Sequence, residues 1–199
     1  VFSAKGGSEL GEPLREGRLK ESGLGRCLAR ADQGAVLEDF APYPLAGNEP
    51  MAFLASPVMT VNGVSGKAER GGTLALRLPR DGVNAVAQRR DGMGRTGETC
   101  FVGHIGGRTV LRSDRTVKDG GLGDEVQAGY LDALFAGKSG TRARLDRDGE
   151  VEIVAYAPLD IPGLQWGVVT AMSLEEAIAP RDKGEETDFF ARYVKNYGY

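Results

Sequence analysis

The stretch from Gly92 to Met172 constrains the fold of this chain more than any other part. It consists of short apolar runs of strand length, most of them separated by glycine or proline turns, and one amphipathic run among them. The amphipathic run, Asp124 to Ala136, places its apolar side chains on one helical face and ends before Gly137. The order of two strands, one helix and three strands predicts an antiparallel sheet with a covering helix.

The first part of the chain repeats this plan with one strand fewer. A helix is predicted from Ser22 to Ala31. Strands are predicted at Val1–Ala4, Ala35–Phe40, Pro50–Met59 and Thr73–Pro79. The sequence therefore predicts an α+β protein of two similar lobes, each an antiparallel sheet with covering helices.

The composition indicates a globular protein. Of the 199 residues 41% are hydrophobic, which is enough to bury a core. The net charge of -3 is spread without a long run of one sign, so nucleic acid is not an expected partner. The sequence contains no apolar run of about 18 residues and no signal-peptide pattern, so we expect no membrane anchor within the chain as given.

No motif in the sequence supports catalysis or metal binding. Ser113 lacks the Gly-x-Ser-x-Gly surroundings of a nucleophile elbow, although an aspartate follows it. The only histidine, His104, and the two cysteines, Cys27 and Cys100, do not have the spacing of a zinc site. We therefore expect no catalytic residue, no metal and no cofactor, and we expect both cysteines to be free core residues.

Several short segments (phrases) of the sequence resemble segments of double Cache domains. Four phrases resemble the membrane-proximal lobe of these domains: Gly97–Gly103, Leu111–Asp114, Val154–Leu159 and Leu164–Val169. The phrases at Glu38–Pro44 and Ala52–Val58 resemble the membrane-distal lobe. Double Cache domains are the extracytoplasmic, PAS-like ligand-sensing domains of bacterial chemoreceptors, sensor kinases and cyclases, and the resemblance covers most of the chain.

The resemblance implies a function as well as a fold. It implies two PAS-like lobes that bind a small polar metabolite in the periplasmic part of a membrane receptor and are not an enzyme. The membrane would be reached only through spanning segments that this sequence does not include, and a homodimer is a further expectation. One alternative is an engineered, permuted binding module derived from such a sensor, and a hydrolase has the least support.

The order of the family segments is inverted in this chain. The tail Thr187–Tyr199 has the pattern of a capped helix with an aromatic face, and in Cache sensors such a segment precedes the first strand of the distal lobe. A circular permutation or a fragment cut in another register would explain the order, and the charged joint Pro180–Glu186 favours permutation. The expected domains are a distal-type lobe at 1–90 completed by 184–199, a proximal-type lobe at 91–180, and a linker at 181–187.

Aromatic side chains with a few charged groups are typical of small-molecule sites. In the distal lobe we expect the ligand to contact Asp39, Phe40, Tyr43, Phe53, Arg77 and Tyr197. The proximal lobe offers a similar set, which leaves open which lobe binds: Arg112, Asp114, Tyr130 and Tyr156. Each aromatic residue, taken alone, could equally be part of the core.

Two further expectations concern the core and the connection between the lobes. Trp166 is expected within the sheet of the second lobe, because it lies in sequence among Leu164, Val168 and Val169. A short helix is expected between Asp81 and Arg90, where it would connect the two lobes.

Overall fold

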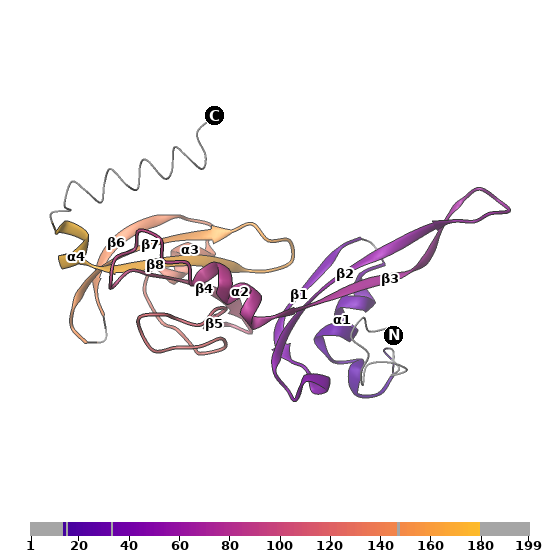
Figure 1. Ribbon diagram of the computed structural model, residues 1–199, viewed down its shortest axis with the longest axis horizontal. Coiled ribbons are helices and arrows are strands. Elements are labelled where there is room, and N and C mark those ends of the chain that lie inside the picture. The colour runs from indigo at the N-terminus through magenta and orange to yellow at the C-terminus, as the bar shows by residue number, and fades with distance from the viewer. Residues whose placement is uncertain (1–13, 15, 33, 147, 180–199) are drawn as a thin grey trace. The chain divides into compact units, whose positions relative to one another are not determined.

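The computed structural model describes residues 14, 16–32, 34–146 and 148–179. It contains two antiparallel sheets with a few helices, so the predicted α+β class is confirmed (Figure 1). The contacts within the chain divide it into two units. The first unit comprises the described residues up to Val86 together with Gly103–Arg108 and Leu159–Trp166. The second comprises Ala87–Val102, Thr109–Pro158 and the described residues from Gly167 onward.

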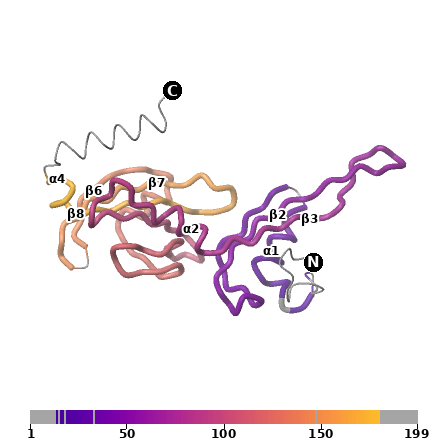
Figure 2. Tube along the Cα trace, viewed as in Figure 1, coloured from indigo at the N-terminus to yellow at the C-terminus, as the bar shows by residue number. Residues whose placement is uncertain are grey.

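The first unit is built on a three-stranded sheet in the order β1-β2-β3. Its strands are β1 (Val36–Pro42), β2 (Pro50–Val61) and β3 (Ala68–Pro79), and β2 and β3 form a long hairpin (Figure 2). Helix α1 (Gly23–Arg30) packs on this sheet, and the short 3-10 helices η1 (Gly17–Leu19) and η2 (Pro44–Ala46) flank α1 and β1. The predicted helix and the three predicted strands in this range are therefore present.

The start of α1 is fixed by a side-chain cap and a glycine. Ser22 accepts a hydrogen bond from the backbone N–H of Gly25 at 3.2 Å and donates one to the Leu19 carbonyl at 2.7 Å. A Cβ atom at Gly25 would lie 2.1 Å from the Leu19 carbonyl oxygen, so this close turn requires glycine. The turn places α1 over the sheet, and a first core forms there from Leu19, Leu24, Cys27, Ala31, Tyr43, Met51, Phe53 and Ala55.

The second unit is built on a five-stranded sheet in the order β5-β4-β8-β7-β6. The strands are β4 (Glu98–Ile105), β5 (Arg108–Leu111), β6 (Gly140–Leu145), β7 (Val151–Leu159) and β8 (Trp166–Ser173). The helices are α2 (Arg80–Ala87), which spans the boundary between the units, α3 (Leu131–Phe135) and α4 (Leu174–Ile178). This order places β4 beside β8, far away in sequence, which brings both ends of the unit into one sheet.

The predicted helix from Asp124 to Ala136 is mostly wrong, because only Leu131–Phe135 is helical. The preceding residues pair with β5 instead: Glu125 forms a bridge with Val110, and the N–H of Val126 donates to Thr109 at 2.9 Å. These backbone bonds replace the ones that a helix would have supplied. The segment does have the apolar spacing of a helix, but it forms an extended stretch followed by the short helix α3.

The short helix α3 covers the second core. A Cβ atom at Gly167 would lie 2.4 Å from a methyl carbon of Leu134, so the glycine in β8 allows the helix to approach the sheet closely. The core beneath it is formed by Cys100, Val102, Leu111, Tyr130, Leu131, Leu134, Val154, Tyr156, Val169 and Ala171. Both cysteines are free and buried, one in each core, as predicted.

Trp166 is buried and begins β8 of the five-stranded sheet, as predicted, but its side chain packs outside the second core. Its ring stacks on Phe40 with centroids 6.1 Å apart, and its Nε1 donates to Asp39 Oδ2 at 3.0 Å. Trp166 is counted with the first unit by its contacts and is not part of the second core. The indole N–H requires an acceptor when buried, and the Asp39 carboxylate supplies one that an aliphatic core would lack.

Two predicted elements lie outside the described residues: the strand at 1–4 and the tail helix at 187–199. Among the helices that are described, none combines the length and the apolar character needed to span a membrane.

Candidate ligand-binding cavity

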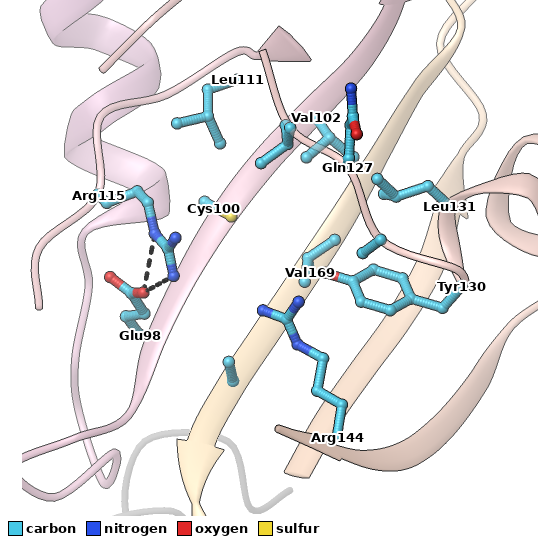
Figure 3. Close-up of a pocket in the computed structure, with 13 residues that line it drawn as sticks. Glu98, Cys100, Val102, Leu111, Arg115, Gln127, Tyr130, Leu131, Arg144 and Val169 are labelled. Carbon is cyan, nitrogen blue, oxygen red and sulfur yellow. Dashed lines mark hydrogen bonds and ion pairs between the residues drawn. The ribbon is translucent and has the colours of Figure 1, made fainter. Parts of the chain in front are cut away.

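A cavity lies in the second unit, between the sheet and the segment that leads into α3 (Figure 3). Its wall is mostly apolar, with Cys100, Val102, Leu111, Val126, Ala128, Leu131, Val169 and Ala171. Its polar lining residues are Glu98, Arg115, Gln127, Tyr130 and Arg144. The centre of a water molecule can occupy about 40 Å³ of the cavity, which is room for about three ordered waters. An apolar wall with a few placed polar groups is typical of a small-molecule site.

The sheet positions these residues through strand periodicity. Glu98, Cys100 and Val102 are alternate residues of β4, so their side chains share one face of the sheet, and all three are buried. Val169 and Ala171 are alternate buried residues of the neighbouring strand β8. The cavity floor is therefore one face of the neighbouring strands β4 and β8.

Glu98 is the most deeply buried polar residue of the lining, with 2% of its surface exposed. Its Oε1 accepts from Arg115 Nε at 2.9 Å and also from Arg115 Nη2, which forms an ion pair. Its Oε2 accepts the backbone N–H groups of Thr116, Val117 and Lys118 at 3.2, 3.0 and 3.3 Å. Burial alone would raise the pKa of Glu98, but the hydrogen bonds from Val117, Arg115 and Lys118 lower it below its usual value. The ionised carboxylate thus fixes the 115–118 segment beside the cavity.

Arg144 reaches the cavity from β6. Its Nε and Nη2 donate to Glu152 Oε1 at 2.6 and 2.5 Å, and its guanidinium carbon lies 5.5 Å from the centroid of the Tyr130 ring. The other oxygen of Glu152 pairs with Lys118, which also donates to Asp146 at 3.0 Å. Burial lowers the pKa of Lys118, but its bonds to Glu152 and Asp146 outweigh this effect and raise it. Glu98, Glu152 and Asp146 are therefore each paired with a cation.

Of two stacked tyrosines in this unit, only Tyr130 lines the cavity. Tyr130 stacks on Tyr156 with centroids 5.2 Å apart and an angle of 20° between the rings. Burial raises the pKa of Tyr130, so its hydroxyl carries its proton at neutral pH and can donate a hydrogen bond. Burial also raises the pKa of Cys100 to about 11, so this thiol is not a nucleophile at neutral pH. The lining can bind and orient a molecule, but it contains no activated nucleophile.

Five of the six residues predicted from sequence to form a distal site are described by the structure, and they lie in separate environments. Asp39 and Phe40 contact Trp166, whereas Tyr43 and Phe53 pack edge to face at 4.9 Å in the first core. Arg77 is exposed on β3, opposite Phe53 in the register, and Tyr197 lies outside the described residues. None of the five described residues of this set lines the cavity. A binding site in the first unit remains a prediction.

The second predicted set fits the cavity better. Tyr130 lines the cavity and Tyr156 stacks on it, while Arg112 is buried in the same unit and Asp114 Oδ1 accepts from the N–H of Leu122 at 2.9 Å. Sequence reasoning missed Glu98, Gln127, Arg115 and Arg144. One signal was available for Glu98, because a glutamate in phase with Cys100 and Val102 on a buried strand requires partners for its charge.

No family model matches this chain, and no curated protein matches it. Solved structures do resemble it. The extracellular domain of mmHK1S-Z3, a protein assigned as a histidine kinase, is 21% identical with a TM-score of 0.51, and the match covers 76% of this chain and 54% of that one.

Two ligand-binding domains of chemoreceptors are also similar. That of Pseudomonas aeruginosa PAO1 PctB, in complex with L-Arg, is 15% identical with a TM-score of 0.48, covering 84% of this chain and 58% of that one. That of Pseudomonas fluorescens CtaA, in complex with L-leucine, is 12% identical with a TM-score of 0.46. The match covers 77% of this chain and 59% of that one. The chain spans less than two thirds of the length of each of these structures. The likeness to mmHK1S-Z3 shows that this chain shares the fold of that extracellular domain.

Proposed function

We propose that this chain is a small-molecule sensing domain of a bacterial signal-transduction receptor of the chemoreceptor, sensor kinase or cyclase type. The observation that carries the proposal is the cavity of the second unit, with its apolar wall and its polar groups Glu98, Arg115, Tyr130 and Arg144. The fold shared with the extracellular domain of mmHK1S-Z3 supports the receptor context. In that context the domain lies outside the cytoplasm and acts as a binding module and not as an enzyme.

A ligand in the cavity would act directly on an element that leaves the sheet. Val169 and Ala171 line the cavity on β8, and β8 continues without a loop into α4. Glu176 of α4 accepts hydrogen bonds from the backbone N–H groups of Arg95 and Thr96 at 2.6 and 2.7 Å, just before β4 begins. A ligand that binds one arrangement of β4, β8 and α4 more tightly than another shifts the population between them.

The finer part of the proposal is a double Cache domain in circularly permuted order. It is supported by the inverted order of the family phrases in the sequence. A reordered chain, with residues 181–199 moved in front of Val1, tests it. A permuted sensor should keep its fold and gain in melting temperature when the order is restored. Loss of cooperative unfolding in the reordered chain would refute the permutation.

A thermal-shift screen with a library of carboxylates, amino acids, amines and sugars tests the sensing function. A ligand that binds only the folded protein adds about 2.7 kcal/mol of stability at about 100 times its dissociation constant. We expect at least one compound to raise the melting temperature in a saturable way. A library without any saturable hit would overturn the proposed function.

Two isosteric variants locate the site. Tyr130→Phe removes one hydroxyl from the cavity, and Tyr43→Phe removes one from the first core, where Tyr43 is buried against Phe53. If only Tyr130→Phe loses the ligand-induced shift in melting temperature, the result supports the cavity as the binding site. Loss in Tyr43→Phe alone places the ligand in the first unit, as the sequence had predicted, and it refutes the cavity.

A further inference from the structure

Resting on the proposed function, we infer that the cavity of the second unit binds a short-chain monocarboxylate. The carboxylate is held by Arg115, Arg144 and the hydroxyl of Tyr130, and the hydrocarbon end lies against the apolar wall. The inference follows from three properties of the cavity: the donors that remain unused, the acceptors that are already used, and its size.

Apart from the amide of Gln127, an exposed residue, the unused hydrogen-bonding groups of the side chains that line the cavity are donors. Arg115 uses Nε and Nη2 on Glu98, and Arg144 uses the same two atoms on Glu152. Among the residues that the structure describes, neither Nη1 atom has a protein acceptor. Figure 3 shows both guanidinium groups and the Tyr130 ring directed toward a common space. Two arginine ends and a phenol match the acceptor oxygens of a carboxylate.

The two buried carboxylates beside the cavity, Glu98 and Glu152, are not available to a cationic ligand. Glu98 already accepts two bonds from Arg115 and three from backbone N–H groups. Glu152 accepts from Arg144 and from Lys118. An ammonium group in the cavity would face two guanidinium groups with no free acidic partner, which disfavours amines and zwitterions.

The size of the cavity limits the carbon chain. Room for about three waters corresponds to about 90 Å³ of liquid, enough for a molecule of about four to six non-hydrogen atoms. The apolar wall, in which Val102, Leu131 and Val169 take part, suits a methyl or ethyl group better than a second polar group. Acetate and propionate have this size and shape, while dicarboxylates place a second charge against aliphatic side chains.

Calorimetric titration of the whole chain tests the inference, with sodium propionate as the probe. Propionamide, which has the same shape without the charge, and sodium chloride at matched ionic strength are the controls. We expect saturable binding of propionate and none of propionamide. Tyr130→Phe and Arg144→Gln should each raise the dissociation constant by about tenfold or more, since each loses a hydrogen bond to a charged group.

Two residues of the same unit provide matched controls. Arg142 lies two residues before Arg144 on β6 and is 5.9 Å from the Tyr156 ring, but it does not line the cavity. The Tyr156 hydroxyl lies on the Gly140 side, since a Cβ atom built there would be 2.7 Å from it, and Tyr156 does not line the cavity either. Arg142→Gln and Tyr156→Phe should keep the wild-type affinity for propionate. If the control variants lose as much affinity for propionate as Tyr130→Phe and Arg144→Gln do, the assigned contacts are refuted.

The outcomes separate this inference from the proposed function. If the library screen yields only amines or neutral compounds, and Tyr130→Phe abolishes their binding, the sensing function stands and the carboxylate assignment is wrong. If propionate binds and neither Tyr130→Phe nor Arg144→Gln weakens it, the assigned site is wrong. If no compound of the library binds, both proposals fail.

Discussion

Replacing Glu98 by glutamine should destabilise the second unit strongly although the two side chains have nearly the same shape. The glutamate is 2% exposed, and its charge faces the Arg115 guanidinium, whose side chain is 16% exposed. Removing one partner of a buried ion pair costs about 3–5 kcal/mol, because the other charge stays behind without compensation. The partial exposure of Arg115 places the expected loss near the lower value, about 3 kcal/mol.

The assay for Glu98→Gln combines two measurements. Denaturant unfolding gives the loss in free energy, with Glu150→Gln, an exposed carboxylate of the same unit, as the control for a change of one charge. Hydrogen exchange of the Thr116, Val117 and Lys118 amides reports directly on the bonds to Glu98, and these amides should exchange faster in the variant. A loss below about 1 kcal/mol with unchanged exchange of these amides would refute the role assigned to Glu98.

Three further predictions concern other parts of the chain. Trp166→Ala should cost about 3–5 kcal/mol in denaturant unfolding, and a loss below about 1 kcal/mol would contradict its packing on Phe40. Bonds from the Thr96 hydroxyl and two backbone N–H groups lower the pKa of Glu176 to about 2, from a usual 4.5. The contribution of the ionised Glu176 to stability is therefore present above about pH 5 and is lost as the pH falls toward 2. The difference in melting temperature between wild type and Glu176→Gln should shrink over that interval. A difference that stays constant would contradict the contact. Thiol titration of the unfolded chain without reductant should count both Cys27 and Cys100, and a count of none would contradict their burial as free thiols.

Much of the fold could be predicted because local patterns agree with it. Apolar runs between turns correctly predicted β1, β2, β4, β7 and β8. The apolar spacing of residues 22–31 correctly predicted α1. The helix expected over 124–136 failed because a pattern of apolar spacing does not show whether a neighbouring strand will pair with the segment. Here β5 does, through Val110 and Thr109.

The cavity could not be predicted because its charged residues come from three distant places in the sequence. Glu98 lies at the start of β4, Arg115 in the segment after β5, and Arg144 on β6, and only the sheet order β5-β4-β8-β7-β6 brings them together. The distal prediction favoured aromatic residues, and aromatic residues fill cores as readily as they line ligand sites. Tyr43 and Phe53 show this, since both belong to the first core.

The most direct test of ligand sensing is a methyl-detected NMR titration of the whole chain with propionate, followed by the hits of the compound library. The leucine and valine methyl groups of the cavity wall, Val102, Leu111, Leu131 and Val169, report on occupancy. The account predicts saturable shifts at these methyl groups, which spread along β8 toward α4 and are absent with propionamide. Saturable shifts confined to the methyl groups of the first unit, or none with any compound, would contradict it.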